Sequence, residues 1–225
     1  MPDLEIACFN AYSARIAAAC GAGRIELCAS FSLGGTTPSL STFLALQTDP
    51  AQITPIHVMI RPRGGNFVYT DEEYQVMLET VDVFSHAGAS GFVFGVLTAS
   101  GSVNLSQCRG LVKRAQGKTC VFHKAFDEIA ETDLEAQLQV LIDSGISAVL
   151  TSGKAASAEE GIEVLRKLIT VAGGRIEIII GGGVRSSNVE KIRDLGAKWL
   201  HSSAVTCKDT ENVDEEEVKA LKNLT

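Results

Sequence analysis

The chain repeats one unit eight times, and this repetition restricts its possible folds more than any other feature. Eight short apolar runs of strand length alternate with segments that carry helical signatures, and the runs occupy residues 4–8, 24–28, 55–60, 91–94, 119–122, 148–151, 175–180 and 199–201. Four helical segments end on a similar phrase that leads into the next run: GAGRIEL from Gly21, GASGFVF from Gly88, GISAVLT from Gly145 and GAKWLHS from Gly196. Because glycine is favoured in the left-handed position after a helix, each phrase predicts a helix end, a short loop and a buried strand.

The helical segments also carry start signals and an apolar stripe. Three segments begin with the pattern of a capping box, in which a hydroxyl and a carboxylate satisfy free backbone N–H groups: Thr70 with Glu73, Thr132 with Glu135, and Ser157 with Glu160. The side chains of Leu134, Leu138 and Leu141 fall on one helical stripe, which predicts a helix packed against a sheet.

The alternation of strands and helices, with right-handed crossovers, predicts an α/β fold, a (β/α)8 barrel of the TIM type. We expect a single domain over residues 1–225, with a short acidic C-terminal segment at residues 207–225. The main alternative is an open doubly wound sheet, which normally shows a G-x-G-x-x-G turn after the first strand. The sequence at that place is CFNAYS, which has no such pattern.

Charge and composition exclude several classes of function. The net charge is −7, and residues 209–217 alone hold six acidic residues and no basic one. Without a basic stripe or zinc-finger spacing, nucleic acid is not expected as a partner. No secretory signal and no apolar stretch near the ~20 residues of a membrane helix is found, so no membrane is expected either. The six cysteines form no C-x-x-C pair, which favours a reducing cytoplasm over a disulfide framework.

Function in such a barrel is located at the C-terminal ends of the strands. The run RIELC places Glu26 and Cys28 on one face of an interior strand, where an acid is costly to desolvate. Two arginines, Arg61 and Arg63, follow the third strand, and a guanidinium suits a carboxylate or a phosphate. For Arg61 we favour an ion pair with Glu26. For Arg63, ligand binding and a salt bridge that braces the loop are equally open.

Small polar turns follow the seventh and eighth strands, where barrels of this class often bind phosphate through backbone N–H groups. The residues expected to bind an anionic ligand at these and neighbouring strand ends are Ser152, Gly181, Gly182, Gly183, His201 and Ser203. The alternative is that the glycines only permit a tight turn, and His201 fits a structural role equally well.

One histidine, His123, ends the fifth strand, and Asp127 follows it. A histidine at this place acts as a general base, a metal ligand or a phosphate donor, or it is only a hydrogen-bonded structural group. The next residue, Lys124, alternates to the other face and is expected to leave the lumen, which argues against a Schiff-base role for it.

Two thiols end neighbouring strands. Cys8 ends the first strand and Cys28 the second, and adjacent strands lie only ~4.8 Å apart, so the two sulfurs approach each other if the register permits. Soft thiolates favour Cu(I), zinc or iron–sulfur chemistry over magnesium or calcium. Free cysteine is also commonly a small buried hydrophobic residue, and spacing alone favours that structural role.

Several long motifs occur together and in one order: RIELCASFSLGGTTPS, VMIRPRGGNFVYT, GFVFGVLTASG, FHKAFD, LTSG and GGGV. With these motifs the chain resembles the copper homeostasis protein CutC family over residues 1–205. The resemblance implies a TIM-type barrel, a cytoplasmic location, self-association as a homo-oligomer and a role in copper trafficking or tolerance. It also implies that Cys8 and Cys28 bind a copper ion, Cu(I), as the cofactor or cargo.

The chain departs from the family pattern at two places. Lys124 stands where the family usually has arginine, which weakens any bidentate contact there. The segment after LHSSA is short and acidic, whereas relatives commonly carry a longer stretch, so closure over the barrel mouth is in question.

Two functions remain, with a third that is less favoured. The first is a copper homeostasis protein that binds Cu(I) through Cys8 and Cys28. The second is a TIM-barrel enzyme that acts on a small phosphorylated or carboxylated metabolite, with Glu26, His123 and Asp127 as catalytic residues. In that enzyme the ligand-binding residues are Arg61, Arg63, Ser152, Gly181, Gly182, Gly183, His201 and Ser203. The third, a non-catalytic oligomeric scaffold, predicts a large exposed apolar face.

Overall fold

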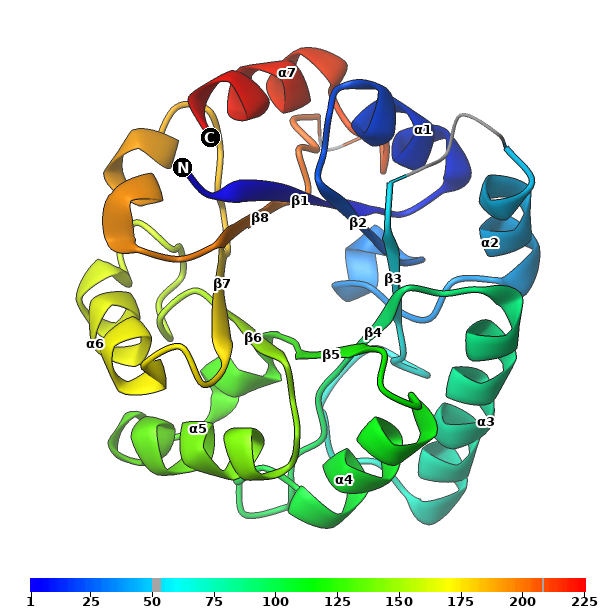
Figure 1. Cartoon of the computed structure of the whole chain (residues 1–225), viewed down its shortest axis with the longest axis vertical. Helices are drawn as coiled ribbons and strands as arrows, with labels where there is room; N and C mark the ends of the chain where they lie inside the picture. The colour runs from blue at the N-terminus through cyan, green and yellow to red at the C-terminus, as the bar shows by residue number, and fades with distance from the viewer. Residues whose placement is uncertain (50–53, 208) are drawn as a thin grey trace.

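A computed structural model describes residues 1–49, 54–207 and 209–225 and shows the predicted (β/α)8 barrel as a single domain. Eight parallel strands close on themselves in chain order, and the helices surround them (Figure 1). The strands are β1 (Asp3–Cys8), β2 (Arg24–Leu27), β3 (Ile56–Met59), β4 (Gly91–Phe94), β5 (Thr119–Phe122), β6 (Ala148–Thr151), β7 (Glu177–Gly181) and β8 (Trp199–Ser202). Every predicted strand is therefore confirmed, with shifts of one or two residues at its ends.

The outer layer is mostly α-helical. Within the described residues its α-helices are α1 (Ala11–Ala19), α2 (Leu40–Gln47), α3 (Asp71–Ala87), α4 (Leu105–Arg114), α5 (Leu134–Asp143), α6 (Ile162–Ala172) and α7 (Glu215–Leu224). Short 3-10 turns are η1 (Phe31–Leu33), η2 (Lys124–Glu128), η3 (Glu131–Asp133), η4 (Val189–Lys191) and η5 (Arg193–Leu195), and the last two occupy the position between β7 and β8. No helix among these residues is long and apolar enough to cross a membrane.

The predicted helix signals have mixed outcomes. The capping box of Thr70 and Glu73 is confirmed at the start of α3, and the C-cap Gly88 has a φ of 100°. The box of Thr132 with Glu135 is wrong, because a 3-10 turn precedes α5 and Asp133 is its N-cap. For Ser157, the hydroxyl accepts from the Glu160 N–H, but α6 begins later, at Ile162. The predicted leucine stripe of α5 is fully buried.

The wall of the barrel separates two apolar clusters. Along β1, Leu4, Ile6 and Cys8 pack outward with residues of the helices. The second cluster fills the lumen. It consists of inward-facing residues, namely Cys28, Met59, Val93, Val121, Ala148, Leu150 and Ile179. This alternation follows from the period of two in a strand, which sends successive side chains to opposite faces.

The acidic C-terminal segment forms ordered structure against α1. The Val213 N–H donates to the Ser13 hydroxyl at 3.1 Å, and Asp214 caps α7 by accepting from two backbone N–H groups. Three glutamates then occupy the first turn of α7, where negative charge complements the helix dipole. Figure 1 shows α7 in the outer ring next to α1.

Glycine at position 91 makes room for a histidine in the lumen, and this gives a test of the packing. A Cβ on Gly91 would lie 2.7 Å from the His57 ring and 2.8 Å from the Thr119 carbonyl oxygen. We expect Gly91→Ala to lower the free energy of unfolding by about 1–3 kcal/mol, because the backbone oxygen cannot move away. Urea unfolding measures this change.

The matched control is Gly64→Ala, whose added Cβ would meet the exposed Leu33 side chain at 3.2 Å, a milder approach in which no backbone atom is among the nearest neighbours. Its cost should stay within about 0.5 kcal/mol. Equal stabilities for the two variants would contradict the described lumen packing.

Candidate functional site

A cavity of about 220 Å³ opens at the C-terminal ends of the strands. Its polar lining comes from the ends of four strands, β2, β3, β5 and β8, and consists of Glu26, Cys28, Arg61, His123, Lys124, His201 and Ser203. Phe9, Phe31 and Phe67 add aromatic surface. A concave, largely apolar pocket with a few convergent polar groups is the usual form of a small-molecule site.

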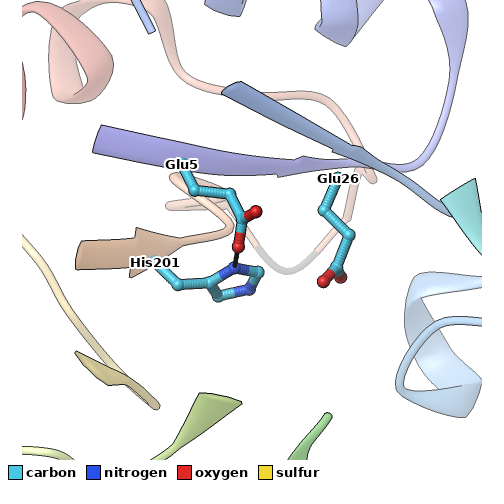
Figure 2. Close-up of side chains that lie close together, drawn as sticks. All are labelled: Glu5, Glu26 and His201. Atoms are coloured by element: carbon cyan, nitrogen blue, oxygen red, sulfur yellow. Dashed lines mark hydrogen bonds and ion pairs between the residues drawn. The ribbon is translucent and has the colours of Figure 1, made fainter. Parts of the chain in front are cut away.

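A buried charged network lies beneath this cavity. The Arg24 guanidinium donates to Glu5 Oε2 at 2.5 Å, and its carbon lies 4.0 Å from the centre of the Trp199 ring. His201 Nδ1 lies 2.7 Å from Glu5 Oε1 (Figure 2). The register explains the contacts, because Glu5 pairs with Arg24 on β2 and with His201 on β8.

The network sets the protonation of its members. Burial alone would raise the pKa of Glu5, but the hydrogen bond with His201 and the charge of Arg24 lower it to about 2. Burial opposes the charged form of His201 as well, yet the carboxylates of Glu26 and Glu5 raise its pKa above the ordinary value. Glu5 therefore holds the Nδ1 proton of His201 in place.

Glu26 lies in the same lumen, but its carboxyl group has fewer polar partners than that of Glu5. Its pKa is raised, mainly by burial. The Cys28 thiol donates to Glu26 Oε1 at 3.3 Å, whereas Oε2 is buried without a hydrogen-bond partner. An acceptor oxygen of this kind is costly unless something else fills the space beside it.

His123 presents a donor to the cavity. Its Nδ1 accepts from the Ala125 N–H at 3.1 Å, so the ring proton is on Nε2, which is buried without a partner. Burial and the nearby Arg61 charge lower the pKa of His123 to about 3. The ring fits because position 95 is glycine, where a Cβ would lie 2.5 Å from it.

The predicted pair of Glu26 and Arg61 does not form. The Arg61 guanidinium donates instead to the carbonyls of residues 33, 34, 35 and 65 at 2.9–3.2 Å. Backbone carbonyls of the β2 and β3 loops converge on this side chain, so Arg61 holds the two loops together under the mouth.

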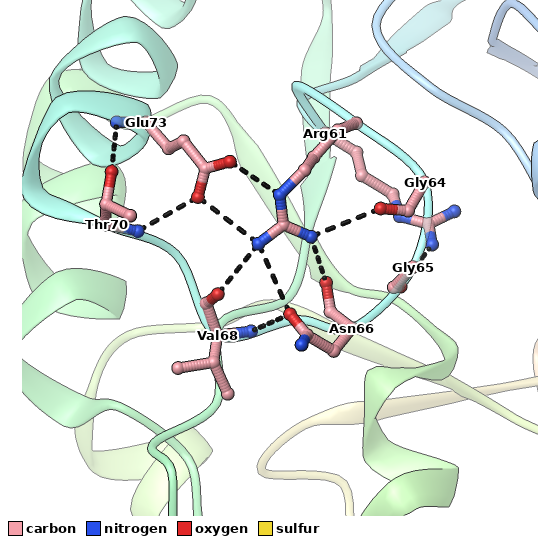
Figure 3. A network of polar contacts seen from close by, with 8 residues as sticks. Arg61, Gly64, Gly65, Asn66, Val68, Thr70 and Glu73 are labelled. Carbon is pink, nitrogen blue, oxygen red and sulfur yellow. Dashed lines mark hydrogen bonds and ion pairs between the residues drawn. The ribbon is translucent and has the colours of Figure 1, made fainter.

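Arg63 braces a loop, which is one of the two roles left open for it. Its guanidinium donates to Glu73 at 2.5 Å and to the Val68 carbonyl at 2.9 Å, with further contacts to Gly64 and Asn66. Figure 3 labels these partners, Gly64, Asn66, Val68 and Glu73, and marks their contacts with dashed lines. The carboxylate of Glu73 also closes the capping box of α3, so loop and helix are tied at one point.

The carboxylate of Asp127 is committed to the loop after β6. It accepts from the Thr151 hydroxyl, the backbone N–H groups of Ser152 and Lys154 at 3.1 Å each, and the Ser152 hydroxyl at 2.9 Å. Both residues that we predicted there, Asp127 and Ser152, are thus engaged with each other rather than with the cavity.

The prediction that Lys124 leaves the lumen is wrong. Strand alternation ends at Phe122, and Lys124 begins the 3-10 turn η2, so its side chain turns back and lines the cavity. Its Nζ lies 3.5 Å from Asp127 Oδ2, and it would lie 3.0 Å from a Cβ on Gly182. Glycine at 182 therefore leaves the ammonium group its place.

The turns after β7 and β8, which contain Gly182 and Ser203, lie beside Lys124, and we call them the ledge. Gly182 and Gly183 have φ values of 106° and 68°, which glycine adopts without strain. Ser203 lines the cavity, and its hydroxyl accepts from Arg185 at 3.2 Å. Arg185 also donates to the Ser202 hydroxyl and the Val205 carbonyl, so it organises the end of β8.

The structure does not bring Cys8 and Cys28 together on one face. Cys8 pairs in register with Leu27 and faces the helices, whereas Cys28 faces the lumen. Burial raises the pKa of both thiols, which disfavours the thiolate. Met59 is a second sulfur-containing side chain in the cavity wall, and both Met59 and Cys28 lie against Gly35. Metal binding by Cys8 and Cys28 stays a prediction.

The fold and the pocket define a (β/α)8-barrel protein with a partly charged cavity at the C-terminal strand ends. The family model of CutC matches residues 3–206, and the chain belongs to the CutC family. The family protein CutC of Bacteroides thetaiotaomicron is 42% identical over 199 residues, which are 88% of this chain and 79% of that protein.

Two further comparisons agree with this assignment. The copper homeostasis protein cutC homolog of Caenorhabditis elegans is 38% identical over 206 residues, covering 91% of this chain and 81% of that protein. The crystal structure of a CutC protein from Streptococcus agalactiae has a TM-score of 0.85 at 32% identity and covers 90% of this chain and 99% of its own. A thiamine phosphate pyrophosphorylase from Pyrococcus furiosus, with a TM-score of 0.64 at 14% identity, shares the fold alone.

Several functional residues were not predicted from the sequence. Glu5 and Arg24 lie in predicted strands, and the polar residues of LEIAC and RIELC alternate with apolar ones. That alternation is a signal that both side chains enter the lumen together with Glu26. No comparable signal marks Arg185, because its partners are set by the loop geometry after β8.

The low pKa of His123 leads to a prediction about stability and pH. The unfolded chain takes up a proton on this residue near pH 6.5, whereas the folded chain does so only near pH 3. The native state is therefore progressively destabilised as the pH falls from about 6.5 towards 3. We expect a His123→Asn variant to lose less stability over this window than the natural chain, in urea unfolding at a series of pH values.

The exposed His86, replaced in His86→Asn, is the control and should leave the pH dependence unchanged. The ring resonances of His123 give a direct measurement by NMR. Titration of His123 near pH 6.5 in the folded protein would contradict the buried, neutral imidazole.

Proposed function

We propose that the cavity binds a small phosphorylated or carboxylated metabolite and carries out acid–base chemistry on it. One observation carries the proposal: Glu26 Oε2 and His123 Nε2 are both buried without partners, and both residues line the same cavity. One is an acceptor and the other a donor. Leaving two such atoms unsatisfied costs on the order of 1–3 kcal/mol each, which a ligand with matching polar groups removes.

The anionic group of the ligand is assigned to the ledge around Lys124. Its ammonium group lines the cavity beside Gly182, and its side chain is 41% exposed, so it can exchange solvent for an anion. The glycine turn of Gly181, Gly182 and Gly183 allows a ligand to approach the backbone closely. Ser203 also lines the cavity, and its hydroxyl accepts from Arg185.

The reacting part of the ligand then lies between Glu26 and His123. A neutral imidazole that donates from Nε2 polarises a carbonyl or hydroxyl oxygen without carrying charge itself. The carboxyl group of Glu26 is placed to exchange a proton with the ligand. Asp127, Arg63 and Ser152 take no part in these steps, since their polar atoms hold the loops that surround the cavity. Arg61 holds the β2 loop through its terminal nitrogens, but it also lines the cavity, and its Nε is buried without a partner.

Several further expectations are part of this proposal and remain predictions. They are copper as a partner, a homo-oligomer, a cytoplasmic location and the absence of nucleic acid among the partners. Exposed apolar side chains on α2 and α3, namely Leu40, Leu44, Val76 and Val83, offer a surface for self-association.

A thermal-shift screen tests the ligand assignment. Phosphorylated and carboxylated metabolites at millimolar concentration should raise the melting temperature, because a ligand at 100 times its Kd stabilises the native state by about 2.7 kcal/mol. Glu26→Gln and Lys124→Ala should each remove most of the shift. The exposed Glu79→Gln variant on α3 is the matched control and should keep it. A broad screen without any stabilising compound would refute the proposal.

Copper binding is the second candidate, and the family relationship together with two sulfur side chains favours it. Cys28 and Met59 both face the cavity, and a thiolate with a thioether is a donor set that suits Cu(I). Cys8 belongs to the cluster under the helices. The cavity-facing pair is therefore the better fit to a copper ion.

Anaerobic competition titration with Cu(I) separates the two possible thiols. We expect Cys28→Ser to weaken binding by more than the ~10–100-fold that is typical of an outer-shell residue, because a soft ligand is lost. Cys8→Ser should leave the affinity within about threefold of the natural value, since its side chain points away from the cavity. Equal affinities for the natural chain and both variants would remove copper from these thiols.

A further inference from the structure

We propose that Glu26 and His201 bind a first-row divalent metal ion of the Mn²⁺ to Zn²⁺ series, with Glu5 as the residue that orients the imidazole. One ligand atom from each of Glu5, Glu26 and His201 lies within 4.8 Å of the other two (Figure 2). The donors are oxygen and nitrogen, so this site differs in kind from a soft copper site. It extends the proposed function, but metal binding itself does not depend on the proposed ligand.

The orientation of His201 is fixed in the way that metal-bound histidines require. Its Nδ1–H donates to Glu5 at 2.7 Å, and Arg24 holds the Glu5 carboxylate from the other side. This leaves Nε2 directed toward Glu26, as the ring edge is in Figure 2, and an ion bound there takes the place of a proton on this nitrogen. A carboxylate that accepts from the far nitrogen of a metal-bound histidine is the usual outer-shell arrangement, and it increases the basicity of the ligand.

The second ligand is the unpartnered oxygen of Glu26. This side chain is 3% exposed, and its Oε2 has no hydrogen-bond partner, whereas Oε1 accepts from the Cys28 thiol. The free oxygen is thus available for a bond that nothing in the chain supplies. Metal-bound oxygen and nitrogen ligands lie ~2.0–2.2 Å from the ion, so two of them are at most ~4.4 Å apart. The ligand atoms of Glu26 and His201 lie within 4.8 Å of each other, and the flexible glutamate side chain can adjust to this span.

The open positions of the ion face the cavity. Glu26 and His201 line it, whereas Glu5 lies below it with both of its oxygens engaged. Two protein ligands leave room for water or for an oxygen of a bound metabolite, which is typical of a catalytic rather than a structural metal site. An ion here replaces the proton that Glu26 and His201 otherwise compete for, and it polarises the ligand oxygen in place of that proton.

Direct titration tests the metal site. We expect one Zn²⁺ per chain by calorimetry after removal of metals, and Co²⁺ bound at the same place without a thiolate charge-transfer band, because no cysteine is a ligand. Glu26→Gln and His201→Gln should each weaken binding by at least 100-fold. Glu5→Gln, which keeps an acceptor for Nδ1 but loses the charge, should weaken it by about 10–100-fold.

Controls keep the outcomes distinct. Glu79→Gln should bind like the natural chain, and far-ultraviolet circular dichroism confirms that each variant is folded. Glu5→Gln leaves Arg24 without its partner, so Glu26→Gln decides the matter if the former does not fold. Absence of saturable binding up to millimolar Zn²⁺ overturns the inference, as does binding that Glu26→Gln and His201→Gln leave unchanged.

The metal site and the proposed ligand can fail separately. The metabolite screen is run once with a chelator and once with Zn²⁺. A stabilising metabolite without any metal binding overturns the metal site and leaves the proposed function in place. Metal binding without any stabilising metabolite overturns the proposed function and leaves the metal site in place.

Discussion

Alternation of side chains across the wall of a closed barrel decides the environment of each strand residue in this protein. In β1, Leu4, Ile6 and Cys8 face the helices, whereas Glu5 and Ala7 face the lumen. The register carries this parity from strand to strand, because residues paired in parallel strands point to the same side. Charged residues of β1, β2 and β8 meet in the lumen for this reason, although they are far apart in the sequence.

The two levels of the lumen differ in how their charged side chains are paired. Arg24 and Glu5 form a buried pair, and loss of one member of such a pair costs about 3–5 kcal/mol because the other is left uncompensated. Arg24 also packs on Trp199 and Glu5 contacts His201, whereas Arg24 Nη2 and His57 Nδ1 are buried without partners at this level. One layer higher, Glu26 and His123 each keep a buried polar atom without a partner. Both of these side chains line the cavity, which is why a ligand or an ion is expected there.

Much of the fold could be predicted from the sequence, because strand runs, helix ends and the buried stripe of α5 are local patterns with a fixed period. The outward direction of the Cys8 side chain could also have been predicted, since Cys8 shares one face of β1 with Leu4 and Ile6. Lys124 could not be placed in this way, because the 3-10 turn η2 resets the direction of its side chain after β5. The predicted partner of Arg61 was wrong for another reason. Its guanidinium donates to backbone carbonyls, and every residue has one, so the residue type gives no signal for this contact. Such contacts of an arginine with distant loops can therefore be identified only once the folded structure is known.

The acidic segment takes part in the mouth even though the family model ends at residue 206. The Glu211 carboxylate accepts from the Phe31 N–H at 2.9 Å, and Asn212 accepts from the Asn10 side chain at 3.0 Å. Phe31 lines the cavity and packs edge-on against Phe9, so one acidic side chain anchors an aromatic wall of the pocket from outside. Arg61 holds the same β2 loop from inside through the carbonyls of residues 33–35. The loop is thus fixed between a cation below it and an anion above it, and the short C-terminal segment supplies the second of these two supports.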